Sequence, residues 1–398
     1  MTQDRPVVRL RPKADPRRIR HGSPWVYANE IVTDRRTQAI EPGKVATLED
    51  AERRPIATVA VNPGSKILCR VLDRDAGAEI SRDWVRARIV RAAGLRRALY
   101  ADPFDRLVHA DADGLPGVIA DLYGKIAVIQ PNSAWAERQF DDLSDAVRQV
   151  TGATRIVKNA SGRARALEGL DEDSRVIGGG IDGPVEVPMN GATYFADLIA
   201  GQKTGLFYDQ RENHAFVARL ARGTRVLDVF SHVGGFALAA LAGGAEHALA
   251  VDGSEAALAL ARRGAETSGV PGRFDTRTGD AFDEMVALAA EGDKFGTVIC
   301  DPPSFAPHKG ALDAGLRAYE KVARLAAALV APSGTLTLCS CSHAADLNKF
   351  RAASIRGIGR AGRSSQILRT GFAGPDHPQH PQLAESGYLK ALTFRLLP

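Results

Sequence analysis

The 398-residue chain has the composition of a globular protein with more than one domain. Charged residues make up 25% of it and hydrophobic residues 44%, and no apolar run approaches the roughly 20 residues that cross a bilayer. Four cysteines are too few for a disulfide framework, and the first residues lack the apolar stretch of a secretory signal. We therefore expect a cytoplasmic protein with reduced thiols and no membrane contact.

The net charge of +5 is modest, but basic residues gather near the start of the chain. They are Arg5, Arg9, Arg11, Lys13, Arg17, Arg18 and Arg20, against Asp4 and Asp15. Such a run indicates either a face that binds a polyanion or a solvated arm. Charge alone leaves both interpretations open.

The pattern of residues 1–74 predicts a small β-rich domain, because short alternating segments are separated by Pro-Gly turns. Residues 75–192 predict an α+β domain that opens with an amphipathic helix over 81–100. The polar side of this helix carries Arg82, Arg86, Arg91, Arg96 and Arg97. The further elements expected in this domain are strands over 115–122 and 126–131, a helix over 136–149, and strands over 154–160 and 184–197.

From residue 193 to 398 the pattern changes to an alternation of strands and helices, which predicts a parallel sheet covered on both faces. The expected strands cover 226–230, 248–252, 274–280, 297–301, 335–340 and 391–397. The Pro-rich stretch before the last strand predicts a loop.

The turn after the first of these strands, Ser231-His232-Val233-Gly234-Gly235-Phe236, suits a ligand at the carboxyl edge of the sheet. Its glycines allow close backbone approach, and Asp252 after the second strand suits ribose hydroxyls. A dinucleotide needs G-x-G-x-x-G for its pyrophosphate, and this turn lacks that spacing. S-adenosyl-L-methionine has no pyrophosphate, so the pattern favours it. Asp280 after the third strand suits an adenine contact, although such an acid alone is more often a helix cap or a solvated loop residue.

The fourth strand ends in Asp301-Pro302-Pro303. Two prolines fix φ at successive positions and so hold the Asp301 carboxylate beside the cofactor. This arrangement suits a planar substrate with an amine or amide edge, and Phe305 suits stacking on that ring.

The fifth strand delivers Cys339-Ser340-Cys341-Ser342. A closed zinc site needs four ligands, and no second pair is evident, so we expect no metal. A thiolate that adds to carbon 6 of a pyrimidine makes carbon 5 reactive toward a methyl donor, which is covalent catalysis. While the strand persists, alternation places Cys339 and Cys341 on the same face and does not choose between them.

Together these segments resemble the class I rRNA methyltransferases typified by the large-subunit (23S) rRNA cytosine-C5 methyltransferase I. The motifs that carry the resemblance are Trp25-Val26-Tyr27-Ala28, Asn62-Pro63, Asp113-Gly114-Leu115-Pro116-Gly117, Gly201-Gln202-Lys203-Thr204-Gly205, Asp209-Gln210-Arg211, Phe230-Ser231, Gly234-Gly235-Phe236, Asp301-Pro302-Pro303, Ser340-Cys341-Ser342, Asp376-His377-Pro378 and Tyr388-Leu389-Lys390. The resemblance implies a PUA-like domain (1–74), an EEHEE domain (75–192) and a Rossmann-like catalytic α/β domain (193–398).

The resemblance also implies residue roles. Cys341 is then the nucleophile, with Asp301 beside it, and Cys339 is a strand residue. Cofactor contacts are implied for Phe230, Ser231, Gly234, Gly235, Asp252, Asp280, Asp301, Gln210 and Arg211. Substrate contacts are implied for Lys203, Pro302, Pro303 and Phe305, with Lys203 and Arg211 as cations for phosphate or for the cofactor's carboxylate.

Two positions depart from the family pattern: His232-Val233 stands where relatives often have Tyr-Thr, and Ser304 where they often have Lys. The implied partner is large-subunit ribosomal RNA. Alternatives are a uracil-C5 or guanine methyltransferase, and an RNA-binding or ribosome-assembly factor with a vestigial catalytic domain. A homodimer is compatible with the sequence.

Overall fold

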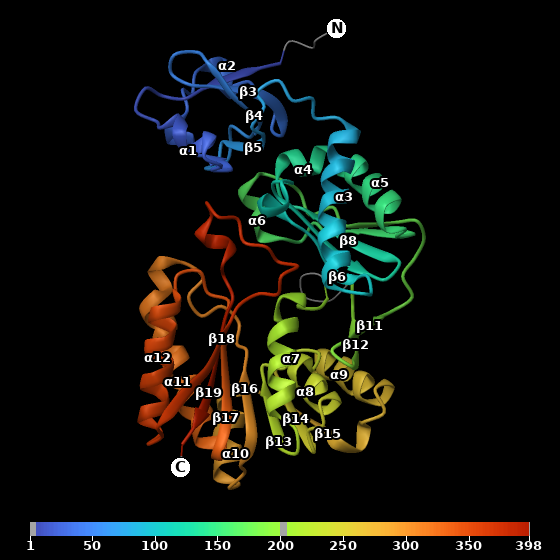
Figure 1. The fold of residues 1–398 in the computed structure, drawn as a ribbon, viewed down its shortest axis with the longest axis vertical. Helices are drawn as coiled ribbons and strands as arrows, with labels where there is room; N and C mark the ends of the chain where they lie inside the picture. The colour runs from blue at the N-terminus through green and yellow to red at the C-terminus, as the bar shows by residue number, and fades with distance from the viewer. Residues whose placement is uncertain (1–4, 200–204, 398) are drawn as a thin grey trace. The chain divides into compact units, whose positions relative to one another are not determined.

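The computed structural model describes residues 5–199 and 205–397. Contacts divide the chain into two compact units (Figure 1). The N-terminal unit comprises Met1–Asp182, Leu198–Thr204 and Pro375–Ser386, and the C-terminal unit comprises Gly183–Asp197, Gly205–Gly374 and Gly387–Pro398. Among the described residues, no helix combines the length and the apolar character needed to span a membrane.

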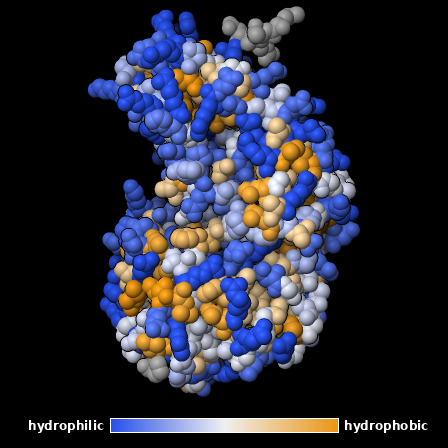
Figure 2. Space-filling model, viewed as in Figure 1, coloured by the Kyte–Doolittle hydropathy of each residue, from blue (hydrophilic) through white to orange (hydrophobic). Residues whose placement is uncertain are grey.

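The N-terminal unit begins with a five-stranded sheet of order β1-β3-β4-β5-β2. Its strands are β1 (Val7–Arg9), β2 (Trp25–Val26), β3 (Lys44–Glu49), β4 (Pro55–Val61) and β5 (Cys69–Asp73), with helices α1 (Pro16–Arg20) and α2 (Arg35–Gln38) between them. The predicted β-rich character is confirmed, although the pattern did not reveal β2 or either short helix. Figure 2 shows mainly hydrophilic residues over the visible surface of this part.

Several arginines of the basic run tie this sheet together. Arg9 pairs with Glu49, and Arg20 pairs with the buried Asp50. The Arg5 guanidinium donates to the carbonyl oxygens of two residues that follow β5. The run is therefore partly structural and partly exposed.

A second five-stranded sheet follows, with order β10-β9-β8-β7-β6. Its strands are β6 (Phe104–His109), β7 (Val118–Tyr123), β8 (Ile126–Pro131), β9 (Arg155–Lys158) and β10 (Arg175–Ile177). The accompanying helices are α3 (Arg82–Leu99), α4 (Ala134–Arg138), α5 (Phe140–Thr151) and α6 (Arg163–Leu167). The expected α+β arrangement is present, and the helix predicted over 136–149 is divided into α4 and α5 at Gln139.

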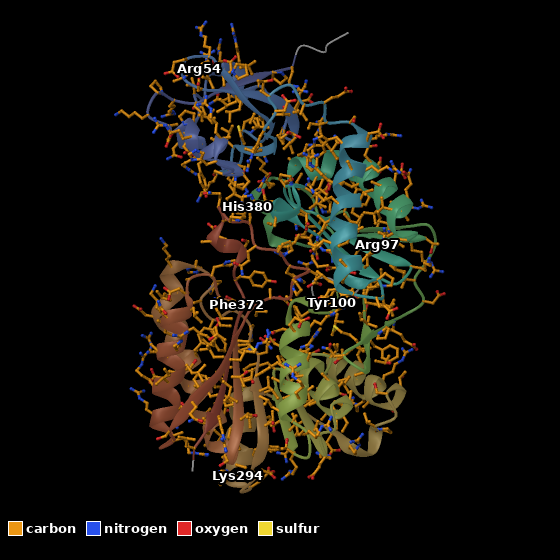
Figure 3. The ribbon with its side chains drawn as sticks, in the orientation of Figure 1. Arg54, Arg97, Tyr100, Lys294, Phe372 and His380 are labelled. Carbon is orange, nitrogen blue, oxygen red and sulfur yellow. The ribbon has the colours of Figure 1, made fainter. Side chains whose placement is uncertain are left out.

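Helix α3 begins at its cap Ser81, whose hydroxyl accepts from the Trp84 amide. One arginine expected on its polar side lies inside the unit instead. Arg96 is 2% exposed and forms a bidentate ion pair with Asp113, at 2.7 and 2.8 Å, whereas its neighbour Arg97 (Figure 3) is exposed. The periodicity did not reveal this because an arginine that has a buried carboxylate partner can occupy the apolar side of a helix.

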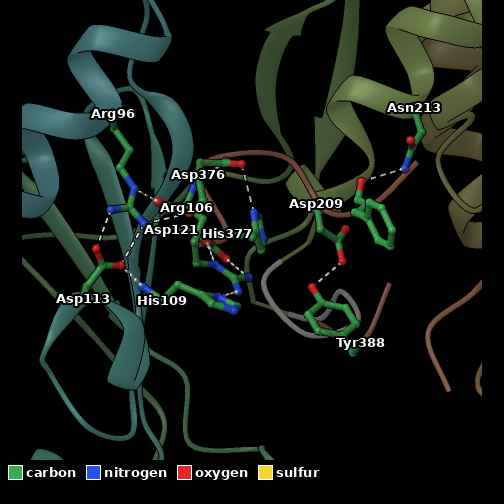
Figure 4. A network of polar contacts seen from close by, with 11 residues as sticks. Arg96, Arg106, His109, Asp113, Asp121, Asp209, Asn213, Asp376, His377 and Tyr388 are labelled. Atoms are coloured by element: carbon green, nitrogen blue, oxygen red, sulfur yellow. Dashed lines mark hydrogen bonds and ion pairs between the residues drawn. The ribbon is translucent and has the colours of Figure 1, made fainter. Parts of the chain in front are cut away.

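The segment Pro375–Ser386 joins the N-terminal unit around the same ion pair (Figure 4). The Arg96 guanidinium also donates to the Asp376 carbonyl at 2.7 Å, and the Asp376 carboxylate accepts from the Arg106 amide at 3.0 Å. The His377 and His109 rings lie 5.1 Å apart, centroid to centroid. The described contacts of Asp376-His377 therefore lie within the interior of this unit.

The C-terminal unit is built on a seven-stranded sheet of order β15-β14-β13-β16-β17-β19-β18. Its strands are β13 (Arg225–Val229), β14 (His247–Asp252), β15 (Phe274–Thr278), β16 (Phe295–Cys300), β17 (Val330–Ser340), β18 (Ser365–Gly371) and β19 (Lys390–Leu396). The first five run parallel, and β19 runs antiparallel to both of its neighbours. The predicted strands are all present, while β18 was not foreseen.

Two groups of helices cover the faces of this sheet (Figure 1). Helices α7 (Arg211–Leu220), α8 (Gly235–Ala242) and α9 (Glu255–Thr267) form one layer, and α10 (Ala281–Ala290), α11 (Leu312–Leu329) and α12 (Leu347–Arg360) form the other. The strands between them contribute buried Val, Leu, Ile and Cys side chains to the core, as a sheet covered on both faces requires. This confirms the predicted α/β Rossmann-like class.

A hairpin of β11 (Val185–Met189) and β12 (Ala192–Ala196) packs on α8 and α9. Its turn is Asn190-Gly191, both with positive φ, as a tight hairpin turn requires. The domain boundary expected at 192/193 falls inside β12, because pairing and packing join both strands to the C-terminal unit. The division at 74/75 stays a prediction.

Candidate active site

The carboxyl ends of β13, β14, β16 and β17 meet at one edge of the C-terminal sheet, since these strands are parallel. This edge brings together the Phe230-Ser231 turn, Asp252, Asp301 and Cys341. The residues that the sequence singled out along more than a hundred positions therefore share one region of the fold.

The turn from β13 into α8 is held in an unusual backbone conformation. Phe230, His232 and Gly234 have φ of 63°, 50° and 78°. The His232 amide donates to one Asp252 carboxylate oxygen at 2.8 Å, and the Ser254 amide donates to the other at 2.8 Å. Asp252 thus fixes the turn while remaining partly exposed at the strand end.

Gly234 and Gly235 serve different needs. Gly234 is left-handed and precedes α8, where a side chain would be strained. A Cβ on Gly235 would lie 2.8 Å from the His214 ring. Gly235 therefore allows His214 to pack against α8, and burial lowers the pKa of His214 to about 3.

Asp228, in β13, is a buried carboxylic acid that the sequence analysis did not select. One oxygen accepts from the Ala237 amide at 2.9 Å, and the other has no partner among the described residues. Burial, together with the nearby carboxylates of Asp301 and Asp252, raises the pKa of Asp228 to about 8. Its signal in the sequence was an acid inside an otherwise apolar strand.

Asp280 caps α10, accepting from the Phe282 and Asp283 amides at 2.9 and 3.2 Å. In this structure the contacts of Asp280 are those of a helix cap. A contact between Asp280 and the adenine stays a prediction.

Asp301 is oriented by a chain of amide side chains from the start of α7. Gln210 Nε2 donates to Asp301 Oδ2 at 2.9 Å, and Asn213 Nδ2 donates to Gln210 Oε1 at 2.7 Å. Gln210 and Asn213 are buried. Gln210 therefore contacts Asp301 directly, and Asn213 is a supporting residue that only the helical spacing from Gln210 could have suggested.

The loop after β16 is bonded to the turn after β17. Ser342 Oγ lies 3.0 Å from Ser304 Oγ, accepts from the Ala306 amide at 3.0 Å and lies 2.7 Å from the Tyr319 hydroxyl. Ser340 Oγ donates to Tyr319 at 2.9 Å. The two serines that flank Cys341 are thus anchored to α11 and to the loop that carries Pro302 and Pro303. Tyr319 was not foreseen.

Phe305 packs in an aromatic cluster with Phe230, Phe282 and Tyr319, at centroid distances of 5.0 to 6.4 Å. It remains half-buried. The contacts that the structure gives Phe305 are with protein rings, and stacking on a substrate base stays a prediction.

The three cysteines near this edge differ in exposure. Cys300 and Cys339 are buried, and burial together with nearby carboxylates raises the pKa of both thiols. Strand β17 ends at Ser340, so Cys341 lies beyond the last strand position and is partly exposed. Exposure therefore favours Cys341 over Cys339 as the reactive thiol, and its role as the nucleophile stays a prediction.

The two predicted cations have different outcomes. Lys203 lies outside the described residues. Arg211 is 7% exposed, and its guanidinium carbon lies 5.4 Å from the centroid of the Tyr208 ring. Within the described ranges, no cluster of His, Cys, Asp and Glu is arranged to hold a metal.

Comparison with known protein families gives two matches: residues 135–395 match the S-adenosylmethionine-dependent methyltransferase family, and residues 8–74 match the PUA-like domain. The chain belongs to the S-adenosylmethionine-dependent methyltransferase family. A relative from Deinococcus radiodurans, named ribosomal RNA large subunit methyltransferase, is 33% identical and covers 98% of both chains. A ribosomal RNA large subunit methyltransferase I from Erwinia tasmaniensis is 31% identical over 94% of this chain and 95% of its own.

Solved structures agree with the methyltransferase fold. A Streptococcus mutans protein described as a SAM-dependent methyltransferase superposes with a TM-score of 0.81 at 19% identity, covering 98% of this chain and 100% of its own. A second structure, described as a methyltransferase complexed with SAH, has a TM-score of 0.82 at 19% identity, covering 99% and 100%. At this identity the likeness concerns the fold.

The methyltransferase cofactor is S-adenosylmethionine, and the residues at the sheet edge fit it. Asp228 Oδ1 and Ser231 Oγ are buried polar atoms without a partner among the described residues. The carboxylates of Asp252 and Asp301 are close enough to Asp228 to raise its pKa. A ligand carrying sulfonium and ammonium charges would relieve this repulsion among the three acids.

Proposed function

We propose that this methyltransferase forms 5-methylcytosine in large-subunit ribosomal RNA through a covalent bond between Cys341 and carbon 6 of the base. The observation that carries the proposal is the bonding of the Ser340-Cys341-Ser342 turn to the loop after Asp301-Pro302-Pro303. A partly exposed thiol and a carboxylate at neighbouring strand ends suit attack on a pyrimidine that bears an amine.

In the proposed reaction, S-adenosylmethionine supplies the methyl group on its sulfonium. The Cys341 sulfur bonds to carbon 6, and the electron pair of the carbon 5–carbon 6 double bond moves to carbon 5, which then takes up the methyl group. Loss of the carbon 5 proton to a base restores that double bond as the sulfur–carbon 6 bond breaks and the thiolate leaves. Asp301, held by Gln210, is positioned to accept a hydrogen bond from the exocyclic amine.

The large-subunit rRNA assignment is supported by the names of relatives that align over nearly the whole chain. It is also supported by exposed basic residues of the PUA-like domain, which are Arg11, Lys13, Arg17, Arg18, Arg20, Arg35 and Arg36. Contacts between these basic residues and RNA phosphates predict that RNA binding weakens steeply as the salt concentration rises. Affinity that is insensitive to salt would contradict this part of the proposal. A ribosomal RNA target supports the expected cytoplasmic location.

The test is methylation of transcribed large-subunit rRNA, followed by digestion to nucleosides and mass spectrometry. The proposal predicts 5-methylcytidine with the wild type and with Cys339→Ala, and none with Cys341→Ala. Methyl groups on uridine or guanosine would assign the alternative base. A folded protein that binds no S-adenosylmethionine in calorimetry would support the vestigial alternative.

A further inference from the structure

The first residue of β19, Lys390, lies beside the end of β17. The antiparallel register pairs Lys390 with Ser340, the last residue of β17, so Cys341 is the next residue beyond that pair. The two strands belong to one sheet, and their hydrogen bonds fix this placement. Lys390 is separated from Cys341 by about fifty residues of sequence, yet the sheet makes them neighbours.

Lys390 is a buried cation with limited compensation. It is 4% exposed, and its Nζ donates to the Ser342 carbonyl oxygen at 2.7 Å. That carbonyl satisfies one of the three ammonium hydrogens and carries no net charge. A buried ammonium normally has an anionic partner, because transfer from water is costly.

Two groups act electrostatically on Lys390: Cys341 and Asp346. Burial lowers the pKa of Lys390, and both of these groups oppose that shift. The Asp346 carboxylate is exposed, caps α12 and pairs with Lys349 at 2.6 Å. Asp346 thus already has a cation beside it, and Cys341 is the other group whose negative charge acts on Lys390.

The thiols of Cys300 and Cys339 lie in electrostatic surroundings opposite to those of Cys341. The carboxylates of Asp301 and Asp228 act on Cys300 and Cys339 and favour the neutral thiol. The Lys390 ammonium acts on Cys341, which the Tyr319 hydroxyl of α11 also faces. His343 lies after the end of β17 and Tyr388 lies before the start of β19, and their ring centroids are 6.0 Å apart. A cation beside a thiol favours the thiolate.

We propose that Lys390 is a positioning residue that acts through Cys341 by stabilising its thiolate before attack. The thiol proton passes to water, the sulfur keeps the electron pair, and Lys390 stays an ammonium throughout. The inference rests on the proposed function only in naming Cys341 as the nucleophile. It assigns the activating charge to a residue that the structure places beside the thiol.

The test measures the thiolate directly in the full-length protein, without RNA or cofactor. Alkylation of Cys341 by iodoacetamide is followed by peptide mass spectrometry as a function of pH, since only the thiolate reacts. For Lys390→Met we expect the midpoint of this profile to rise by about one pH unit, and alkylation near neutral pH to slow by about tenfold. Lys390→Arg keeps the charge and should retain the wild-type midpoint within a few tenths of a unit.

The matched control is Lys294→Met, which removes an exposed lysine just before β16, at the amino end of that strand (Figure 3). It should leave the profile unchanged. Circular dichroism establishes that each variant is folded, and if Lys390→Met does not fold, the same comparison is made with Lys390→Gln. A folded neutral variant with the wild-type midpoint would overturn the proposal.

The readout separates this inference from the proposed function. If Lys390→Met shifts the alkylation profile while no 5-methylcytidine forms on RNA, the substrate assignment fails and the thiolate stabilisation stands. If 5-methylcytidine forms while the profile does not move, the role of Lys390 fails and the substrate assignment stands.

Discussion

The hydroxyl groups of Tyr319 and Ser342 lie 2.7 Å apart, which joins the buried side of α11 to the residue after Cys341. The same phenol accepts from Ser340 at 2.9 Å, so it bridges the two serines that flank the thiol. All three side chains are buried, and none of them can exchange its lost partner for bulk water. The conformation of the Cys341 turn therefore depends on a residue from a different element.

Replacing Tyr319 with Phe should loosen this turn. Two buried serine hydroxyls lose their shared partner, which should lower the free energy of unfolding by ~1–3 kcal/mol and slow methyl transfer. Urea unfolding and the initial rate of methylation measure both effects. Tyr27→Phe makes the same change at a residue that is 36% exposed and should have neither effect. Wild-type rate and stability in Tyr319→Phe would show that the bridge is dispensable.

Gln210→Leu should weaken the site through Asp301. The substitution keeps the approximate volume but removes the donor to Asp301 and the acceptor for Asn213. Because a buried amide is left without its partner, we expect the cofactor affinity or the methyl-transfer rate to fall by about tenfold. Calorimetry with S-adenosylmethionine and rate measurements read the two quantities separately. The exposed Gln366, changed to Leu, is the matched control. Unaltered affinity and rate in Gln210→Leu would contradict the positioning role.

Asp228 should make stability depend on pH. Its folded-state pKa of about 8 exceeds the ordinary value of 3.8, so the folded protein keeps a proton that the unfolded chain releases. The free energy of unfolding should therefore fall as pH rises from about 4 to about 8. Asp228→Asn cannot titrate, and its decline between about pH 5 and about pH 8 in urea unfolding should be smaller. The exposed Asp283→Asn should behave as wild type. An undiminished decline in Asp228→Asn would refute this.

The Arg96–Asp113 pair should be essential to the N-terminal unit. Removing one partner leaves the other charge buried, which costs about 3–5 kcal/mol. We expect Arg96→Met to lower the thermal midpoint strongly and to expose Pro375–Ser386 to protease, because Arg96 also bonds the Asp376 carbonyl. Arg97→Met, at the exposed neighbouring position, should resemble wild type. Equal stability of the two variants would argue against the buried pair.

The sequence predicted most of the C-terminal sheet because its strands are buried on both faces and alternate with helices. It did not predict β18, whose central residues are exposed and whose pattern is that of an edge strand. It placed Arg96 on the surface because helical periodicity contains no information about Asp113, which lies on the 3₁₀ turn after β6.

The sequence could select candidate-site residues where they end or directly follow a strand, as Asp252, Asp301 and Cys341 do. Supporting residues were missed because their neighbours are distant in sequence. Tyr319 reaches Ser342 from α11, and Lys390 reaches Cys341 through the β17–β19 register. Neither residue carries a local signal of these contacts, since a tyrosine in an amphipathic helix and a lysine at the start of a strand are ordinary.

Trapping the enzyme on RNA that contains 5-fluorocytidine tests the central claim most directly, because fluorine blocks release of the base from the sulfur. The account predicts a covalent protein–RNA adduct, dependent on S-adenosylmethionine for its methylated form, with the wild type and with Cys339→Ala, and no adduct with Cys341→Ala. An adduct that survives Cys341→Ala would contradict the assignment of Cys341 as the nucleophile.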